Sequence, residues 1–225
     1  MLPAYRPDKA LTVHDPATFN GWTAKLEAAA NIEIRNFNAF LDALTKRHDY
    51  FHAMGSRMSD HGLNSAFSEP CSHEDAANIF DRARNHNAAD PHEHAQFASY
   101  LMLHFGRLDA AKGWTKQLHL GARRSNNTRM FRQVGPDTGF DSIGDWPQID
   151  NVARYMDQLD QEGRLPKMIL YNLNPADNYA FATVIGNFQD GTTPGKIQFG
   201  SGWWFLDQKE AMEWQINALS NCGLL

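Results

Sequence analysis

The chain has 225 residues, of which 42% are hydrophobic, 12% aromatic and 21% charged. This composition is typical of a folded globular protein that can bury a core without disulfide bonds, and it excludes a disordered chain. The 21 basic and 26 acidic residues give a net charge of -5. A general binder of nucleic acid or of anionic membranes would need a basic excess, so we expect no nucleic-acid and no membrane partner.

Cysteine content and hydropathy exclude further classes of protein. Cys71 and Cys222 are too few for a disulfide scaffold and lack the CxxC spacing of a zinc site. No run approaches the roughly 20 apolar residues of a membrane span, and residues 1–6 lack the core of a signal peptide. We therefore expect a cytoplasmic protein.

Helix signals recur along the chain. Asp15-Pro16 is an N-cap followed by a first-turn proline and predicts a helix over residues 16–30, and a second apolar stripe stops at Gly55. Further helices are predicted over residues 72–85 and 91–111, near Pro147, from Asn174-Pro175, and from Asp207, where Glu210 would complete a capping box.

Short apolar segments between these helices predict strands over residues 2–6, 57–63, 116–122, 167–173 and 196–203. Their alternation with helices indicates βα units and a parallel sheet, either doubly wound or part of a (β/α)8 barrel. No linker divides the sequence, so we expect one domain over residues 1–225 with a helical insertion around 73–112. Residues 121–145 are polar and too long for an ordinary turn, which favours a functional loop.

Every predicted strand ends in polar or aromatic residues. In parallel α/β proteins the reactive groups come from these carboxyl ends and the loops beyond them. For any one strand end, a hydrogen-bonded cap or a buried structural histidine is the ordinary alternative. Five such ends at one edge of a sheet favour a functional site.

Six segments of the chain resemble the uronate (glucuronate) isomerase family: LPAYRPDKA at 2–10, SDHGL at 59–63, QLHLGA at 117–122, NNTRMF at 126–131, GPDTGFDS at 135–142 and LYNLNPADN at 170–178. The resemblance covers essentially the whole chain in order. It implies the distorted (β/α)8 TIM barrel of the amidohydrolase superfamily, here incomplete with about five βα units. It also implies cytoplasmic interconversion of D-glucuronate with D-fructuronate and of D-galacturonate with D-tagaturonate.

The family's metal pocket uses a His-x-His pair from the first barrel strand and an Asp-Ser-Arg motif from the eighth, and neither stands at the matching place here. The resemblance therefore implies an internal or C-terminal portion that lacks the first and last strands. Zinc or another divalent metal would be bound by residues outside this chain, and we assign no metal ligand within it. His92-Glu93-His94 has the right spacing but lies at a predicted helix start, where residues two apart point to different sides.

An aldose–ketose isomerase needs a base, a group that polarises the carbonyl and a cationic clamp for the carboxylate. Arg6 suits the clamp because a guanidinium offers a planar fork of donors. Pairing with Asp8 or Asp60 is its structural alternative. Asp60 and His61 are adjacent on one strand, so only one can face the barrel lumen, and the resemblance favours Asp60 as a catalytic residue.

Three further positions complete the predicted site. His119 alternates with two leucines, which turns its imidazole to the opposite face, and the resemblance places it beside metal and substrate as the second catalytic candidate. Arg129, in the long polar loop, is a candidate substrate-binding cation, with solvation on a helix surface as the alternative. Of the tryptophans at 203 and 204, we favour Trp204 as the ring that closes the pocket on the sugar.

We expect a small-molecule hexuronate as the ligand, a homo-oligomer, and little isomerase activity from this polypeptide alone. One alternative is a non-catalytic barrel fragment that assembles through its open sheet edges. The other is a metal-dependent hydrolase of the same superfamily, in which His61 and His119 would bind the metal.

Overall fold

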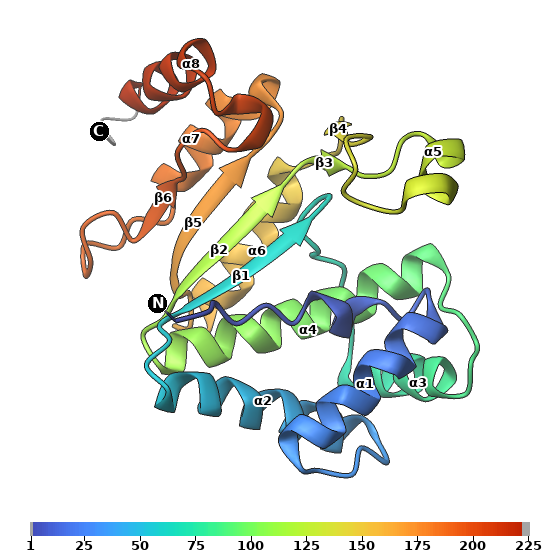
Figure 1. Ribbon diagram of the computed structural model, residues 1–225. Coiled ribbons are helices and arrows are strands. Elements are labelled where there is room, and N and C mark those ends of the chain that lie inside the picture. Colours follow the sequence, from blue (N-terminus) through green and yellow to red (C-terminus); the bar gives the residue numbers. More distant parts are fainter. Residues whose placement is uncertain (1, 222–225) are drawn as a thin grey trace. The chain divides into compact units, whose positions relative to one another are not determined.

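The strands form a main sheet with parallel pairing. The computed structural model describes residues 2–221, and its main sheet has the strand order β1-β2-β5-β6 (Figure 1). The strands are β1 (Met58–Leu63), β2 (Thr115–Leu120), β5 (Lys167–Asn172) and β6 (Ile197–Phe199). β5 and β6 pair in parallel, and the strand order follows the chain. The predicted α/β class with a parallel sheet is confirmed.

Two predicted strands are much shorter than expected. The segment 2–6 reduces to a single parallel bridge between Tyr5 and Ser59, because Pro3 on one side cannot donate to a ladder. The segment 196–203 reduces to β6, which ends at Phe199. Glycines at 200 and 202 weaken a strand there, so the chain leaves the sheet before the tryptophans.

Helices flank the strands much as the caps predict. Asp15 accepts a hydrogen bond from the Thr18 N–H, and Asp90 forms a capping box with Glu93. The predicted Asp207 cap is wrong, because Gln208 is the N-cap and accepts from the Glu210 N–H. The helices are α1 (Pro16–Ala30), α2 (Phe37–Ala53), α3 (His73–Arg84), α4 (Pro91–Ala111), α5 (Thr128–Val134), α6 (Ile149–Gln161), α7 (Asn178–Gly186) and α8 (Lys209–Ser220), with short 3-10 helices η1 (Asp8–Leu11), η2 (Pro175–Asp177) and η3 (Trp204–Leu206). Within residues 2–221 no helix has the length and apolar character needed to cross a bilayer.

The chain divides into two compact units. Unit 1 comprises Met1–His61, Phe67–Thr115 and Asp157–Pro166, and unit 2 comprises Gly62–Ala66, Lys116–Met156 and Lys167–Leu225. The single partial barrel domain over residues 1–225 stays a prediction.

Unit 1 has an aromatic core and a buried polar network. Rings from α1, α2 and α3 meet there, with the Phe19, Phe40 and Phe80 centroids 5.1 to 5.9 Å apart. Beneath β1, the Asp109 carboxylate accepts from the His48 ring at 3.0 Å and from the Ser59 hydroxyl at 2.6 Å. Three elements are thereby tied to one buried carboxylate, which fixes β1 against α2 and α4.

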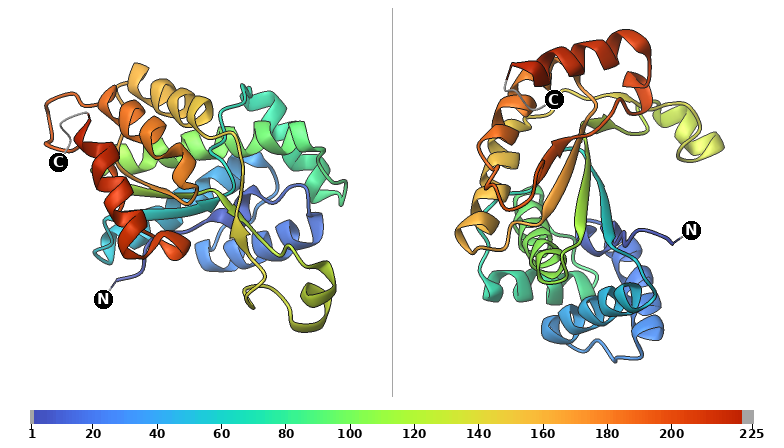
Figure 2. Two further views of the ribbon diagram at one scale, coloured as in Figure 1. Left: turned by 90° about the horizontal axis from the view of Figure 1, so that it is seen from above. Right: turned by 90° about the vertical axis from the view of Figure 1, so that its left-hand side faces the viewer.

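In unit 2, α7 packs on β6 and alongside α8 (Figures 1 and 2). The predicted polar loop is a flap, residues 122–143, whose base is the antiparallel pair β3 (Ala122–Arg123) and β4 (Ser142–Ile143) and whose tip carries α5. No residue of α5 is buried. The flap is therefore a projecting element, attached to its own unit at the base.

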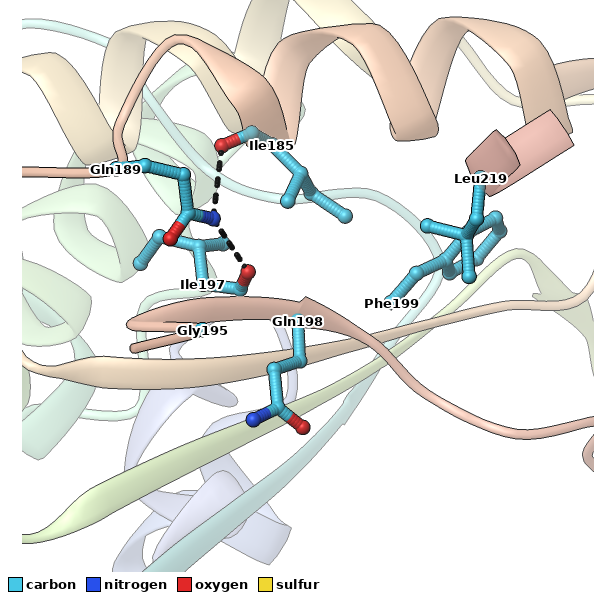
Figure 3. A pocket seen from close by; sticks show the side chains of 7 residues that line it. All are labelled: Ile185, Gln189, Gly195, Ile197, Gln198, Phe199 and Leu219. Carbon is cyan, nitrogen blue, oxygen red and sulfur yellow. Dashed lines mark hydrogen bonds between the residues drawn. The ribbon is translucent and has the colours of Figure 1, made fainter. Parts of the chain in front are cut away.

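A cavity of about 340 Å³ lies among α7, β6 and α8 (Figure 3). Its lining residues are Ile185, Gln189, Gly195, Ile197, Gln198, Phe199 and Leu219, none of which ionises. The Gln189 amide donates to the carbonyl of Ile185 at 3.3 Å and to that of Ile197 at 2.7 Å. Gln189 thus holds the end of α7 to β6, and the cavity lacks the groups that proton-transfer chemistry requires.

Candidate functional site

Arg6 and Asp60, two of the predicted site residues, lie together in unit 1 in a carboxylate cluster formed by Arg6, Asp8, Asp60 and His61. The Arg6 Nε lies 3.2 Å from Asp8 Oδ2, and Arg6 Nη1 lies 3.4 Å from Asp60 Oδ2. The other oxygen of Asp8 is 2.8 Å from His61 Nδ1. Asp8 therefore bridges the arginine and the histidine, a role that the sequence did not reveal.

The cluster separates Asp60 from His61 as alternation on β1 predicts. His61 is fully buried and stacks on Phe105 of α4, with ring centroids 5.6 Å apart. The Asp60 side chain retains 14% exposure and that of Arg6 51%. Both ion pairs foreseen as the structural alternative for Arg6 are formed, yet half of its side chain remains open to solvent.

Unit 2 holds the second group, an aromatic frame formed by His119, Tyr171 and Trp203. The imidazole of His119 lies flat on Tyr171, with centroids 4.3 Å apart and planes 5° apart, and Trp203 approaches at 4.6 Å and 64°. Leu118 and Leu120 are buried on the opposite face of β2, as the alternation predicts. His119 is half-buried, with the Tyr171 ring stacked on its face and the Trp203 ring in an edge-to-face contact.

The two tryptophans have different surroundings. Trp203 packs on the small buried cluster of Ala122, Leu173, Leu206 and Ala211. Trp204, with a left-handed φ of 54°, is 37% exposed, and its ring lies 4.5 Å from the Arg124 guanidinium. Because β6 ends at Phe199, strand alternation does not decide between them. Trp203 is the ring that contacts His119, and a sugar contact of Trp204 stays a prediction.

The flap carries Arg129 and also Arg124, a residue that the sequence motifs do not mark as part of the site. Arg129 is exposed on α5, with Nη1 3.4 Å from the Gln133 side-chain oxygen. Arg124 Nη1 lies 3.0 Å from Asp137 and 3.1 Å from the nearly buried Asp141. Arg124 therefore links the base of the flap to the Trp204 segment, whereas Arg129 is placed as a solvated helix residue.

Titratable groups outside these clusters have clear pKa shifts. Burial raises the pKa of Asp177, with a further contribution from the charge of Asp145, and its Oδ2 is a buried atom without a hydrogen-bond partner. Burial, and secondarily His14, lowers the pKa of His94 to about 4. His94 lies against His14, with ring centroids 4.1 Å apart. Among residues 2–221 there is no group of three or more His, Cys, Asp or Glu side chains placed to bind a metal ion.

The predicted residues thus fall into two groups. Arg6 and Asp60 belong to unit 1, and His119, Arg129 and Trp204 to unit 2. The first group can bind and position anionic or hydroxyl groups through a half-exposed guanidinium and carboxylates. The second presents an imidazole that can donate or accept a proton. Tyr171 was not predicted as a site residue, although the sequence contained a signal for it. It alternates with two buried neighbours on β5, which puts its side chain on the same face as the other positions of that strand that are not buried.

Comparison with known proteins points to one family. The family model described as glucuronate isomerase matches residues 1–225. The uronate isomerase of Solibacter usitatus is 65% identical over 224 residues, which cover 100% of this chain and 48% of that protein. That of Opitutus terrae is 64% identical over 225 residues, again 100% of this chain and 48% of the relative. The chain therefore spans about half the length of the curated relatives it matches.

Solved structures agree with the sequence comparison. The crystal structure of a uronate isomerase from Thermotoga maritima superposes with a TM-score of 0.89 at 26% identity, over 99% of this chain and 48% of that one. A glucuronate isomerase from Caulobacter crescentus gives a TM-score of 0.86 at 21% identity, over 99% and 45% of the two chains. The fold of this chain is thus found within structures about twice its length.

Proposed function

Because the chain belongs to the glucuronate isomerase family, whose model matches residues 1–225, we propose that it takes part in aldose–ketose isomerisation of hexuronates. The substrates would be D-glucuronate, converted to D-fructuronate, and D-galacturonate, converted to D-tagaturonate. The observation that carries the proposal is the 65% identity to a uronate isomerase over 224 residues. That match covers both units of this chain, so the carboxylate cluster and the aromatic frame both lie in the region that the two proteins share.

The reaction removes the proton from carbon 2 of the aldose and returns one to carbon 1 through an enediol, while the two oxygens exchange their protonation. In this proposal Arg6 holds the substrate carboxylate with the part of its guanidinium that remains exposed. Asp60 and His119 are the catalytic residues. A carboxylate and an imidazole are the two side-chain types that most often act as general base and acid.

Two further residues are proposed to bind substrate. Arg129 would supply a second cation from the flap, and its exposure on α5 leaves it accessible. Trp204 would offer an apolar ring face to the sugar, supported by its 37% exposure. Arg129 lies on a helix with no buried residue, and Trp204 keeps this exposure although its ring also contacts Arg124 and Phe205.

The wider setting of the chain is also proposed. The parallel strands would be an incomplete (β/α)8 barrel of the amidohydrolase type, supported by the TM-score of 0.89 to the Thermotoga maritima protein. Zinc or another divalent metal would have its principal ligands outside this chain, as the resemblance to the family implies. We propose a cytoplasmic homo-oligomer that acts on a small sugar acid.

The direct test is an exchange enzyme, in which this chain replaces the matching 224 residues of the Solibacter usitatus uronate isomerase. We expect it to convert D-glucuronate to the ketose with kcat/KM within about tenfold of the parent, because a functional half keeps its catalytic geometry. A folded exchange enzyme without measurable turnover would contradict the proposal. Exchange of the same segment from Opitutus terrae, 64% identical to this chain, is the matched control.

The 225-residue chain alone tests the assembly alternative. We expect very slow ketose formation from either uronate. A base, a group that polarises the carbonyl and a clamp must act together, and no residue of this chain is proposed as the polarising group. Rapid turnover would show that this chain contains a complete site. β6 is the last strand in the order β1-β2-β5-β6 of the main sheet, and a sheet edge favours association, so light scattering of the same sample should show more than a monomer. A strict monomer would count against assembly through that edge.

A further inference from the structure

We propose that Tyr171 is a positioning residue that fixes the imidazole plane of His119, and that the absence of a side chain at Gly200 is what allows it to do so. This inference rests on the proposed function, in which His119 transfers a proton. In this inference Tyr171 acts through His119 and does not itself contact the reacting atoms of the substrate. The geometry that supports it lies entirely within unit 2.

The stack between the two rings leaves the imidazole little freedom of rotation. With planes 5° apart and centroids 4.3 Å apart, a rotation of His119 about its second side-chain torsion would drive its edge into the phenol ring. Trp203 blocks the space on another side at 4.6 Å. A proton-transferring histidine needs its nitrogen lone pairs aimed in a fixed direction, because misplacement by about 1 Å can cost 100-fold in rate.

Tyr171 is itself held from two directions. Gln117, which precedes His119 by two residues on β2, donates from Nε2 to the Tyr171 hydroxyl at 3.0 Å. Directly after the neighbouring strand β6, a Cβ built at Gly200 would lie 2.4 Å from Cδ1 and 2.5 Å from Cε1 of the Tyr171 ring. The ring therefore occupies the volume that any side chain at position 200 would fill.

The backbone of Gly200 cannot easily move away from such a clash. Its N–H donates to the Leu170 carbonyl at 2.8 Å, and its own carbonyl accepts from the Gln215 amide. Its φ lies outside the left-handed region, so alanine is acceptable to the backbone at this position. Substitution Gly200→Ala should accordingly displace the Tyr171 ring rather than the strand, and release His119 without touching it.

The test uses the exchange enzyme with Tyr171→Leu, Tyr171→Phe and Gly200→Ala. We expect Tyr171→Leu and Gly200→Ala each to lower kcat about 10- to 100-fold while KM changes less than about threefold, because substrate contacts are untouched. Tyr171→Phe, which keeps the ring, should restore kcat to within about threefold. Gly186→Ala is the matched control, since a Cβ there meets no atom within 4 Å, and it should leave both constants unchanged.

A double variant separates positioning from a general loss of stability. If Gly200→Ala acts by displacing the ring, it should cost nothing further in kcat, and little in thermal stability, when Tyr171 is already alanine. Alanine is used because leucine would keep a Cγ, and the Tyr171 Cγ lies 2.9 Å from the added Cβ. Additive losses in kcat would overturn the proposal. So would a Tyr171→Phe variant as slow as Tyr171→Leu, or a fall in kcat/KM that comes wholly from KM.

A spectroscopic readout on the 225-residue chain keeps this inference distinct from the proposed function. Stacking on a phenol ring shifts the His119 ring protons upfield in NMR spectra. These signals are assigned as the histidine signals that disappear in the variant His119→Gln. We expect the shift in the parent and in Tyr171→Phe, and its loss in Tyr171→Leu and Gly200→Ala. An inactive exchange enzyme with this pattern of shifts would contradict the proposed function but support the positioning role of Tyr171. An unchanged shift in Gly200→Ala would contradict the positioning role alone.

Discussion

The carboxylate cluster and the aromatic frame hold their polar groups in opposite ways. In the cluster, Arg6 and His61 are fixed by charged hydrogen bonds to Asp8. In the frame, His119 is fixed by the faces and edges of neutral rings. Ion pairs fix a group through charge, whereas stacked rings fix its plane through packing. The cluster suits substrate binding, and the frame suits proton transfer.

Acid should distinguish the two units most strongly. Burial, with smaller contributions from Arg107 and His48, lowers the pKa of His104 to about 4, and the pKa of His94 falls similarly. Both residues lie on α4 in unit 1. The unfolded chain binds these protons near pH 6.5, so stability is full above that pH and is lost as pH falls from about 6.5 to 4. For His104 the loss is on the order of 3 kcal/mol.

Urea unfolding at pH 7 and pH 5 measures about 2 kcal/mol of this loss for His104. His104→Gln should roughly halve the pH dependence, because His94 is then the remaining one of the two histidines with a lowered pKa. His92→Gln on the same helix, where the side chain is exposed, should keep the parent slope. Hydrogen exchange at pH 5 should increase in α4 before it increases in β5. Equal acid sensitivity of the parent and His104→Gln would remove this difference between the units.

The two tryptophans give the next largest effect. Trp203→Ala should cost about 2–3 kcal/mol in unfolding free energy, because the ring packs on a buried cluster. Trp204→Ala should cost about 1 kcal/mol or less, since the ring is 37% exposed and loses contacts with the Arg124 guanidinium and the likewise exposed Phe205. Urea unfolding compares the two variants. A larger cost for Trp204 would reverse the assignment of the inward-facing ring.

The carboxylate cluster should give a smaller effect. Asp8→Asn removes the charge that Arg6 and the buried His61 share, and we expect a loss of about 1–2 kcal/mol. Asp137→Asn removes a carboxylate from the Arg124 pair, but this side chain is 76% exposed, so we expect less than about 0.5 kcal/mol. Thermal unfolding in low and high salt checks both values. If both aspartates behaved as surface charges, the cluster would not be a fixed binding element.

Local patterns in the sequence predicted the helix starts and the faces of the strands. Caps at Asp15 and Asp90 and the alternation around His119 involve neighbours in the chain, whose geometry is set by local rules. The site was less predictable where it depends on contacts between distant segments. The stack of Tyr171 on His119 and its dependence on Gly200 join three strands, and no single strand's pattern contains that information.

The tryptophan pair shows the same limit in a different form. Alternation alone does not choose between Trp203 and Trp204, because the strand does not continue to position 203. Two glycines end it at Phe199, and the left-handed backbone at Trp204 then turns the second ring toward Arg124. The residue types were recognised from the sequence, but their directions depend on where the strand stops.

The most direct test of the central claim is kcat/KM for D-glucuronate in the exchange enzyme with and without His119→Ala. If His119 transfers a proton in the reaction, kcat/KM should fall by about 100- to 10,000-fold while the thermal unfolding midpoint changes little. If kcat/KM were unchanged in the folded variant, His119 would have no part in the chemistry, and the proposed division between a binding cluster and a proton-transfer frame would be wrong.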